Sequence, residues 1–558
     1  MTSSESYHPI RSWIIEHVLA NPKKAIALPA LFSLFMGIGI NYLVIDDDMM
    51  AMLPETLDSR MSWDAVQDEF GSTEVIFIAF GNKGKTVYSS ETFSLLWDLT
   101  KALENVNQVE EVSCITTISR IDSEDGFMEI SDLQPERDLT PPQIDKIKEY
   151  LISNPTIKKR AVSESEEYFN IMVQPYEDIP HDIMRDVVVT VGDSILSADY
   201  EIHYGGTAYI TGSVPTMIRN DITILLRVGL FIMAIVLMVN LRNPFAVIMV
   251  FSVIIQSLVV MAGFMGWMVF MTGSERFYFT IVNSSMPIIL LTIANSDGVH
   301  FVAKFFKEMR NKKDAKQSVE VTMDTLLVPI FLTSLTTMAA FLSLSFAPIK
   351  QLMGYGICIS VGIAHAFVLS STFLPAAISL KKWDMNSKAV TRPSIFERLI
   401  TYFGKTVSTN PKSILGSGVL IATAGIIGLL YLKVDVNIAS FFRQGTEFRD
   451  SIDFIDQEMT GTMDIRVRLE GSMKNPKTLN EIVNLQDMLE NNKKVTTSFS
   501  IADVVKQMHR VVMDDDPDFE TIPEDQGKVN NLFSMYSMSG DPEDFSAMVD
   551  YEYSVGLV

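Results

Sequence analysis

The stretch FYFTIVNSSMPIILLTIANSDGVHFVAKFF, residues 277–306, places two ionisable side chains, Asp297 and His300, in a sequence apolar enough to cross a membrane. A carboxylate at the centre of a bilayer costs about 2.5–3.5 kcal/mol on insertion scales, so it usually has a function. Helical spacing puts His300 on the same face as Asp297. Loss of water favours the uncharged form of both groups. We therefore interpret the pair as a proton relay in preference to a purely structural contact.

Other polar residues in apolar stretches are weaker candidates for the same relay. His365, in SVGIAHAFVLSS, either joins the relay or packs as a hydrogen-bonded histidine, and we prefer the second interpretation. Four further residues are expected to support the relay through hydrogen bonds: Asn295, Gln256, Thr336 and Thr337. Threonines within spans, however, most often bond their own backbone.

The composition predicts a membrane protein with large domains outside the bilayer. The 558 residues are 47% hydrophobic, yet their formal net charge is −23. These values agree if apolar spans alternate with acidic soluble segments. Because a span needs about 20 mostly apolar residues, seven stretches qualify: Ala25–Ile45, Ile222–Val239, Pro244–Met271, Phe277–Val302, Leu326–Phe346, Leu352–Leu380 and Ser413–Leu432.

Several classes of function are disfavoured. The acidic balance argues against nucleic acid as a partner. The seven histidines are scattered, and neither CxxC nor HExxH occurs, so we expect no metal site and no cofactor. The two cysteines are too few for a disulfide framework. A phosphate-binding loop is missing from the sequence, which disfavours an ATP-driven pump.

Basic residues predict the topology, because they concentrate on the cytoplasmic side of membrane proteins. They cluster before the first span, after the second, between the fourth and fifth, and between the sixth and seventh. We therefore expect residues 1–24 (an amphipathic helix) and 381–412 (a linker and amphipathic helix) in the cytoplasm. Residues 46–221 and 433–558 are expected outside, and 222–380 form a five-span block.

The chain contains an internal repeat. The segment that begins NPKKAIALP at Asn21 resembles the one that begins NPKSILGSG at Asn410, and the similarity extends to SWDAVQDEF and SIDFIDQEM. Each copy has an amphipathic helix, a span and the start of an outside domain. The second copy ends within its domain, so we expect an incomplete chain with seven of twelve spans.

The outside domains are predicted to be α+β. In the first, the order of strands and helices is β-α-β then β-α-β, ending with the strand YEIHYGGTAYI, which suits a ferredoxin-like sandwich. Residues 120–143 between the two halves are expected to form an insertion or mobile loop. In the second domain we expect strands at DIRVRLEG, KVTTSFSI and YEYSVGLV.

These features resemble the resistance–nodulation–division (RND) superfamily, in particular its Patched-like and MMPL-like exporter branch. The most specific stretches are GGTAYITGSVPTMIRNDI, residues 205–222, and the fifth and sixth spans, residues 327–376. The five-span block is similar to a sterol-sensing domain. IANSDGVHF resembles the family's fourth-span motif at Asp297 and His300, but has Asn295 and Ser296 where small apolar residues are usual.

The resemblance implies an α-helical RND-type membrane protein with inserted ferredoxin-like domains. It implies proton-driven export of hydrophobic or amphiphilic molecules, such as lipids, hopanoids or sterol-like compounds. It further implies a bacterial inner membrane with the large domains in the periplasm, a homodimer or homotrimer, and periplasmic lipid-binding partners. The substrate-binding residues are not identified by the sequence.

Two alternatives belong to other functional classes. A non-transporting lipid or sterol sensor is the main one, because sterol-sensing folds can bind lipid without moving it. An intramembrane aspartyl protease would need two carboxylates on facing spans, whereas Asp297 lies alone at depth. We therefore expect that the protein is not an enzyme.

Overall fold

The computed structural model describes residues 9–46, 53–72, 74–124, 127–176, 179–196, 199–433, 442–459, 461–492 and 494–558. The chain divides into two compact units. One comprises Met1–Pro54 and Pro215–Asp435, and the other comprises Glu55–Val214 and Val436–Val558. Each unit is therefore built from two segments that are far apart in the sequence.

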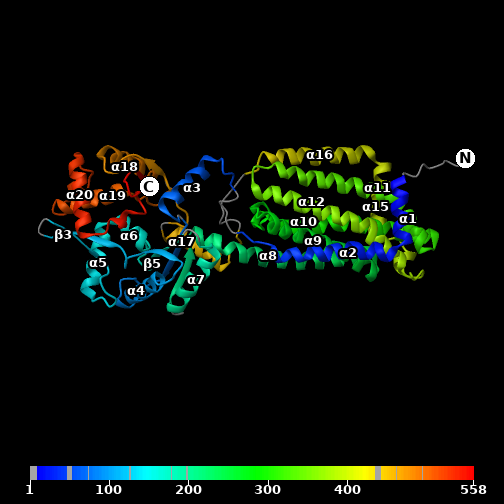
Figure 1. Ribbon diagram of the computed structural model, residues 1–558, viewed down its shortest axis with the longest axis horizontal. Coiled ribbons are helices and arrows are strands. Elements are labelled where there is room, and N and C mark those ends of the chain that lie inside the picture. The colour runs from blue at the N-terminus through cyan, green and yellow to red at the C-terminus, as the bar shows by residue number, and fades with distance from the viewer. Residues whose placement is uncertain are drawn as a thin grey trace. The chain divides into compact units, whose positions relative to one another are not determined.

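The first unit is a helical bundle (Figure 1). Its elements are α1 (Pro9–Ala20), α2 (Pro22–Ile38), η1 (Gly39–Tyr42), α8 (Thr207–Leu241), α9 (Pro244–Thr272), η3 (Glu275–Phe277), η4 (Ile281–Ser285), α10 (Met286–Lys312), α11 (Ala315–Leu342), η5 (Ser343–Phe346), α12 (Lys350–Val368), the π-helical η6 (Leu369–Phe373), α13 (Leu374–Leu380), α14 (Lys388–Thr391), α15 (Ile395–Thr409) and α16 (Pro411–Leu429).

All seven predicted spans are confirmed as helices long and apolar enough to cross a membrane. They lie at Pro22–Tyr42, Thr207–Leu241, Pro244–Thr272, Ile281–Lys312, Ala315–Phe346, Lys350–Leu380 and Pro411–Leu429. Prolines occupy the first turns of α2, α9, α10 and α16, where the missing N–H has no partner to lose. Asn243 caps α9 by accepting a hydrogen bond from the Ala246 N–H at 3.1 Å.

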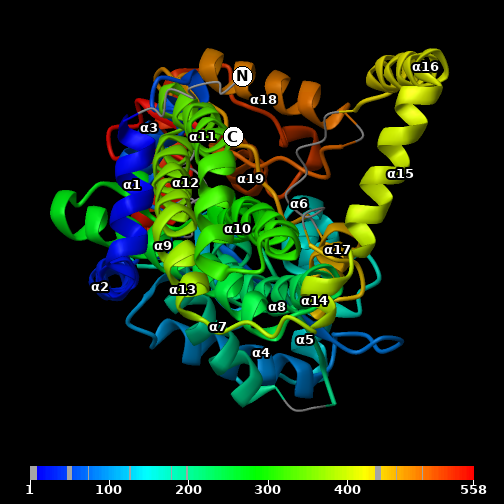
Figure 2. The same cartoon turned by 90° about the vertical axis from the view of Figure 1, so that its right-hand side faces the viewer.

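Glycines bring α2 and α9 into close contact. A methyl group at Gly263 in α9 would overlap the carbonyl oxygen of Met36, and one at Gly266 would overlap that of Gly39. Small residues of this kind let helix backbones approach within a membrane, where packing rather than the hydrophobic effect holds helices together. In contrast, α16 has no buried residue, and Figure 2 shows it standing apart from α9–α12.

The second unit is α+β. It contains α3 (Asp58–Phe70), β1 (Ile76–Gly81), α4 (Ser90–Glu104), β2 (Val109–Ser113), β3 (Ser119–Glu124), β4 (Phe127–Asp132), α5 (Pro141–Ser153), α6 (Pro155–Ala161), β5 (Tyr168–Pro175), α7 (His181–Ile195), β6 (Glu201–Gly205), α17 (Glu447–Glu458), β7 (Arg468–Glu470), α18 (Pro476–Glu490), α19 (Ile501–Val512), η8 (Pro517–Phe519), α20 (Gln526–Ser539), η9 (Pro542–Phe545) and β8 (Val555–Leu557).

The main sheet confirms the predicted ferredoxin-like order. Its strands lie in the order β2-β5-β1-β6, and every neighbouring pair is antiparallel. Each β-α-β half therefore places its second strand at an edge, as in a split β-α-β sandwich. The last strand is shorter than predicted, because it ends at Gly205 and the residues TAYI already belong to α8.

Two ion pairs at equivalent positions of the two copies support the internal repeat. In α3, Arg60 binds Asp64 at 2.8 Å, and in α17, Arg449 binds Asp453 at 2.9 Å. Both pairs join residues four apart on a helix, and both follow a membrane span at the same place in their copy. The β1-α4 sequence of elements likewise recurs as β7-α18.

Two segments of this unit differ from the loop and the strand that the sequence suggested. Residues 120–143, expected to be an insertion or mobile loop, include most of β3 and all of β4, which form an antiparallel hairpin inserted between the two β-α-β halves. It buries Ile121 and Met128 in a core shared with α19 and α20. KVTTSFSI forms no strand in its described part: Ser500 instead caps α19, accepting from the Ala502 N–H at 3.2 Å, and Phe499 lies under Arg160.

Candidate functional site

The carboxyl group of Asp297 is fixed by a neighbouring helix. Asp297 lies in α10 and is half-buried. The hydroxyl of Ser334, a buried residue of α11, donates a hydrogen bond to its Oδ2 at 3.1 Å. Its Oδ1 has no hydrogen-bond partner among the described residues. One carboxyl oxygen is thus held by the protein, and the other remains available to accept a proton.

The residue next to Asp297 allows close packing on the opposite side. Gly298 is buried against α9, and a methyl group at this position would lie 3.3 Å from Val250. A larger side chain would therefore press on α9 and turn α10. Since Asp297 must face α11 to reach Ser334, this close approach helps to set the rotation of α10.

The predicted partner, His300, lies within electrostatic range of Asp297. It lies one turn after Asp297, but its side chain is exposed, and no hydrogen bond joins the two residues in the described part of the chain. Thr292, Ser296 and His300 are exposed at intervals of four residues, so they form a polar stripe on one face of α10. The geometry therefore places Asp297 between this stripe and α11.

Ser334 is a site residue that the sequence analysis missed. It lies in LTSLTT beside the predicted candidates Thr336 and Thr337, which bond the carbonyl oxygens of Leu332 (2.9 Å) and Thr333 (2.7 Å) in their own helix. Helical spacing could have identified Ser334, because it continues the buried stripe formed by Met323, Leu327 and Ile330.

Asn295 faces a different environment from Asp297. It is half-buried in α10, and its Oδ1 atom is buried without a hydrogen-bond partner in the structure. Two residues along a helix turn a side chain by more than half a circle, so Asn295 and Asp297 lie on different faces. Asn295 therefore does not contact the carboxyl group directly among the described residues, and its supporting role stays a prediction.

His365 belongs to a second, separate polar cluster. It is buried in α12, and its Nε2 lies 2.8 Å from the hydroxyl of Ser33 in α2. The same hydroxyl lies 3.2 Å from Oε1 of Gln256 in α9. No hydrogen bond links this trio to Asp297 among the described residues. The trio joins three helices, and His365 has the hydrogen-bond partner that a packed histidine requires.

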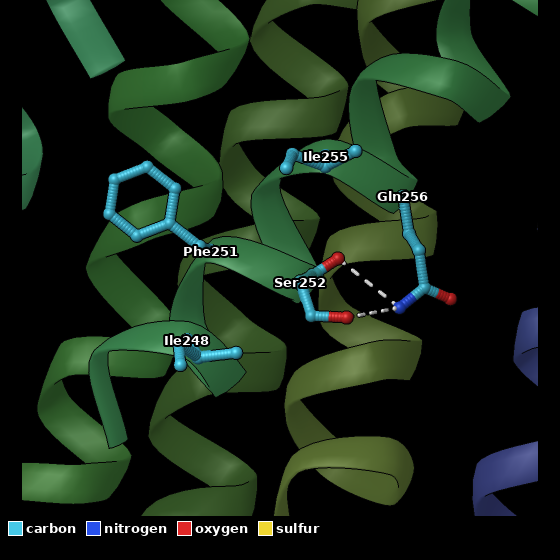
Figure 3. A pocket seen from close by; sticks show the side chains of 5 residues that line it. All are labelled: Ile248, Phe251, Ser252, Ile255 and Gln256. Carbon is cyan, nitrogen blue, oxygen red and sulfur yellow. Dashed lines mark hydrogen bonds between the residues drawn. The ribbon is translucent and has the colours of Figure 1, made fainter. Parts of the chain in front are cut away.

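Gln256 also borders a cavity of about 290 Å³ on α9, lined by Ile248, Phe251, Ser252, Ile255 and Gln256. Figure 3 shows its amide nitrogen turned back to Ser252, where it donates to the carbonyl oxygen at 3.2 Å and to the hydroxyl at 3.0 Å. Both ends of the amide are therefore occupied, by Ser33 and by Ser252.

The chemistry available at Asp297 is proton binding. Among the described residues, no group of three or more histidine, cysteine, aspartate or glutamate side chains is arranged to hold a metal ion. A single half-buried carboxyl with one fixed donor can exist in two charge states within a membrane. A change of charge there would favour one packing of α10 and α11 over another.

Comparisons with known proteins agree with this architecture. The sequence model of the MMPL family matches residues 51–426. A membrane protein of the archaeon Methanocaldococcus jannaschii is 22% identical over 359 residues, which cover 63% of this chain and 89% of the relative. The matched region contains Asp297, Ser334 and His365.

Proposed function

Because the chain belongs to the MMPL family of transporter-type membrane proteins, we propose that it is a proton-driven transporter of hydrophobic or amphiphilic molecules. The class of cargo is lipid, hopanoid or sterol-like. The main support for the proposal is the contact between Asp297 and Ser334. The Ser334 hydroxyl can stabilise the carboxylate form of Asp297 within a membrane span, where a charge is otherwise costly.

The coupling follows from the cost of charge in hydrocarbon. When Asp297 is charged, it gains most from the Ser334 hydroxyl and from any water that reaches Oδ1. When it is protonated, that demand falls, and α10 can shift against α11. Alternation between the two packings would drive export, provided that Asp297 meets different sides of the membrane in each.

The proposal includes an orientation. The ends of the spans that carry the basic residues would face the cytoplasm, and the α+β unit would lie on the outer side of a bacterial inner membrane. Amphiphilic cargo would then reach the protein from the outer leaflet or the periplasm. Assembly as a dimer or trimer, and periplasmic lipid-binding partners, belong to the same proposal.

The test is transport of a fluorescent phosphatidylethanolamine analogue and a fluorescent sterol by full-length protein in proteoliposomes. Asp297→Asn keeps the size of the side chain but cannot ionise, so transport should be abolished while insertion and folding persist. Glu308→Gln makes the same chemical change on the same helix, at an ion pair with Lys304 (2.9 Å), and should retain most activity. Normal transport by Asp297→Asn would overturn the proposal.

A further inference from the structure

Four arginines converge at one end of the helical bundle. Arg242 lies in the turn between α8 and α9, Arg310 in the last turn of α10, Arg392 just after α14, and Arg398 in α15. We call these four residues the basic cluster. They come from four separate segments of the first unit, so the fold rather than the local sequence brings them together.

The basic cluster is short of negative charge. Arg310 binds both carboxylate oxygens of Glu397, at 2.8 and 2.9 Å. Arg242 and Arg310 also donate to the carbonyl oxygen of Arg392, at 2.6 and 3.4 Å. Among the described residues, Glu397 is the carboxylate in ion-pair contact with the cluster. The four guanidinium groups of the cluster are therefore accompanied by one ion-paired carboxylate among the described residues, and that carboxylate contacts Arg310.

The like charges are close enough to affect one another. Burial lowers the pKa of the Arg242 guanidinium, and the charges of Arg398 and Arg310 lower it further. Arg392 acts in the same direction, and Glu397 offsets only part of the effect. Such an arrangement is unfavourable by itself, and a bound anion would relieve it.

Two further features of Arg242 suggest that it binds a group from outside the chain: an unpaired polar atom and a strained backbone. Its Nε–H is buried and has no hydrogen-bond partner among the described residues. Its backbone has a φ of 51°, in the left-handed region that normally favours glycine or asparagine at the end of a helix. A functional requirement for the side chain would explain why an arginine occupies this strained position.

The surroundings place the basic cluster at a membrane surface. Arg242 directly follows the span that ends at Leu241. At the same end of the spans, Lys381 lies over the rings of Phe245 (3.9 Å) and Trp383 (5.0 Å). Tryptophan and lysine concentrate at the boundary between hydrocarbon and water. The exposed apolar side chains of α15 fit the same boundary: Ile395, Phe396, Leu399, Ile400, Tyr402 and Phe403.

We propose that the basic cluster binds the phosphate group of an anionic phospholipid. Guanidinium groups match phosphate oxygens in pairs, and basic pockets between spans are suited to phospholipid head groups. The lipid phosphate would accept from the guanidinium groups of Arg242, which is partly exposed, and of Arg398, which is exposed. The acyl chains would extend along the apolar face of α15. This site is separate from Asp297 and does not depend on the proposed transport mechanism.

The test is native mass spectrometry of the full chain in detergent with added phosphatidylglycerol or phosphatidylcholine. The wild type should retain phosphatidylglycerol preferentially, and the preference should fall about fivefold for each arginine removed. Arg242→Gly removes a guanidinium and relieves the backbone, so lipid retention should fall while thermal stability is unchanged or higher. Arg398→Gln removes an exposed guanidinium without an ion-pair partner in the described chain and should give the same loss.

Lys412→Gln is the matched control, because Lys412 is an exposed cation in the first turn of α16. It should retain the wild-type preference. Equal retention of the two lipids by the wild type would overturn the proposal, as would equal losses in Lys412→Gln and Arg242→Gly. Glycerol phosphate distinguishes the source of the anion: if it binds as well as the lipid does and with the same dependence on Arg242, the ligand is a soluble phosphate and the lipid assignment fails.

Discussion

The hydroxyl of Ser334 lies 3.1 Å from Oδ2 of Asp297, so the fifth predicted membrane span donates a hydrogen bond to a carboxyl group of the fourth. This contact is the direct structural link between the proposed proton site and a movable neighbour.

Ser334→Ala should slow transport without preventing it. The substitution removes one hydrogen bond to a chargeable group, worth about 1.5–3 kcal/mol when the partner is ionised, which corresponds to a rate lower by about 10- to 150-fold. The measurement is the initial rate of lipid transport in proteoliposomes. Thr336→Ala is the control, because Thr336 is exposed and bonds only its own helix. Equal rates for the two variants would remove Ser334 from the mechanism.

Ser33→Ala should affect stability more than transport. It leaves the buried His365 without its hydrogen-bond partner, at a cost of about 1–3 kcal/mol. Thermal unfolding in detergent measures the loss, and the double variant with His365→Phe should lose less than the sum of the single changes. If His365→Phe instead abolished transport at normal stability, His365 would belong to the proton relay.

Gly263→Ala should destabilise the contact between α2 and α9. The added methyl overlaps the Met36 carbonyl oxygen, and overpacking of this kind costs about 1–3 kcal/mol. Gly418→Ala is the matched control, since no atom lies within 4 Å of the added methyl in α16. It should be neutral or slightly stabilising, because alanine favours helix. Similar unfolding curves for the two variants would contradict the close packing.

Acid should loosen the contact between α3 and β7. Arg468 donates to both carboxylate oxygens of Glu69, at 2.7 and 2.6 Å, and this lowers the pKa of Glu69. A lowered folded-state pKa means that the contribution is present above the ordinary pKa of glutamate and is lost as the pH falls through the lowered value.

Hydrogen exchange of the β7 and β8 amides measures this contact. Because the pair is solvent-accessible, the effect should be about 1 kcal/mol or less. Glu69→Gln should lower the protection of these amides at neutral pH, measured relative to their intrinsic exchange rates, and should remove the pH dependence of that protection. Glu470→Gln, at an exposed carboxylate that also contacts Arg468, should have little effect. A pH dependence that persists in Glu69→Gln would assign it to another group.

Local patterns were sufficient to predict the spans and the main sheet. A run of about 20 apolar residues has few structural alternatives, and the β-α-β order with short connections restricts the strand order. The hairpin at β3 and β4 could not be predicted in this way. Its apolar residues, Ile121 and Met128, are buried by helices more than three hundred residues later in the chain.

The site was predictable only in part. Asp297 stands out because a carboxylate is costly in a span, but the rotation of α10 is set by its packing against α9 and α11. Sequence spacing suggested His300 as a proton partner, which stays a prediction, but it did not suggest the hydrogen bond that Ser334 of α11 donates to Asp297. The same limit applies to His365, whose partner Ser33 lies in another span.

The most direct test of the account is the dependence of lipid transport on a proton gradient, measured in proteoliposomes of the wild type and of Asp297→Asn. If Asp297 couples transport to protons, an imposed pH gradient accelerates transport by the wild type, a protonophore abolishes this acceleration, and Asp297→Asn responds to neither. Equal wild-type rates with and without the gradient would contradict proton coupling and favour a lipid sensor.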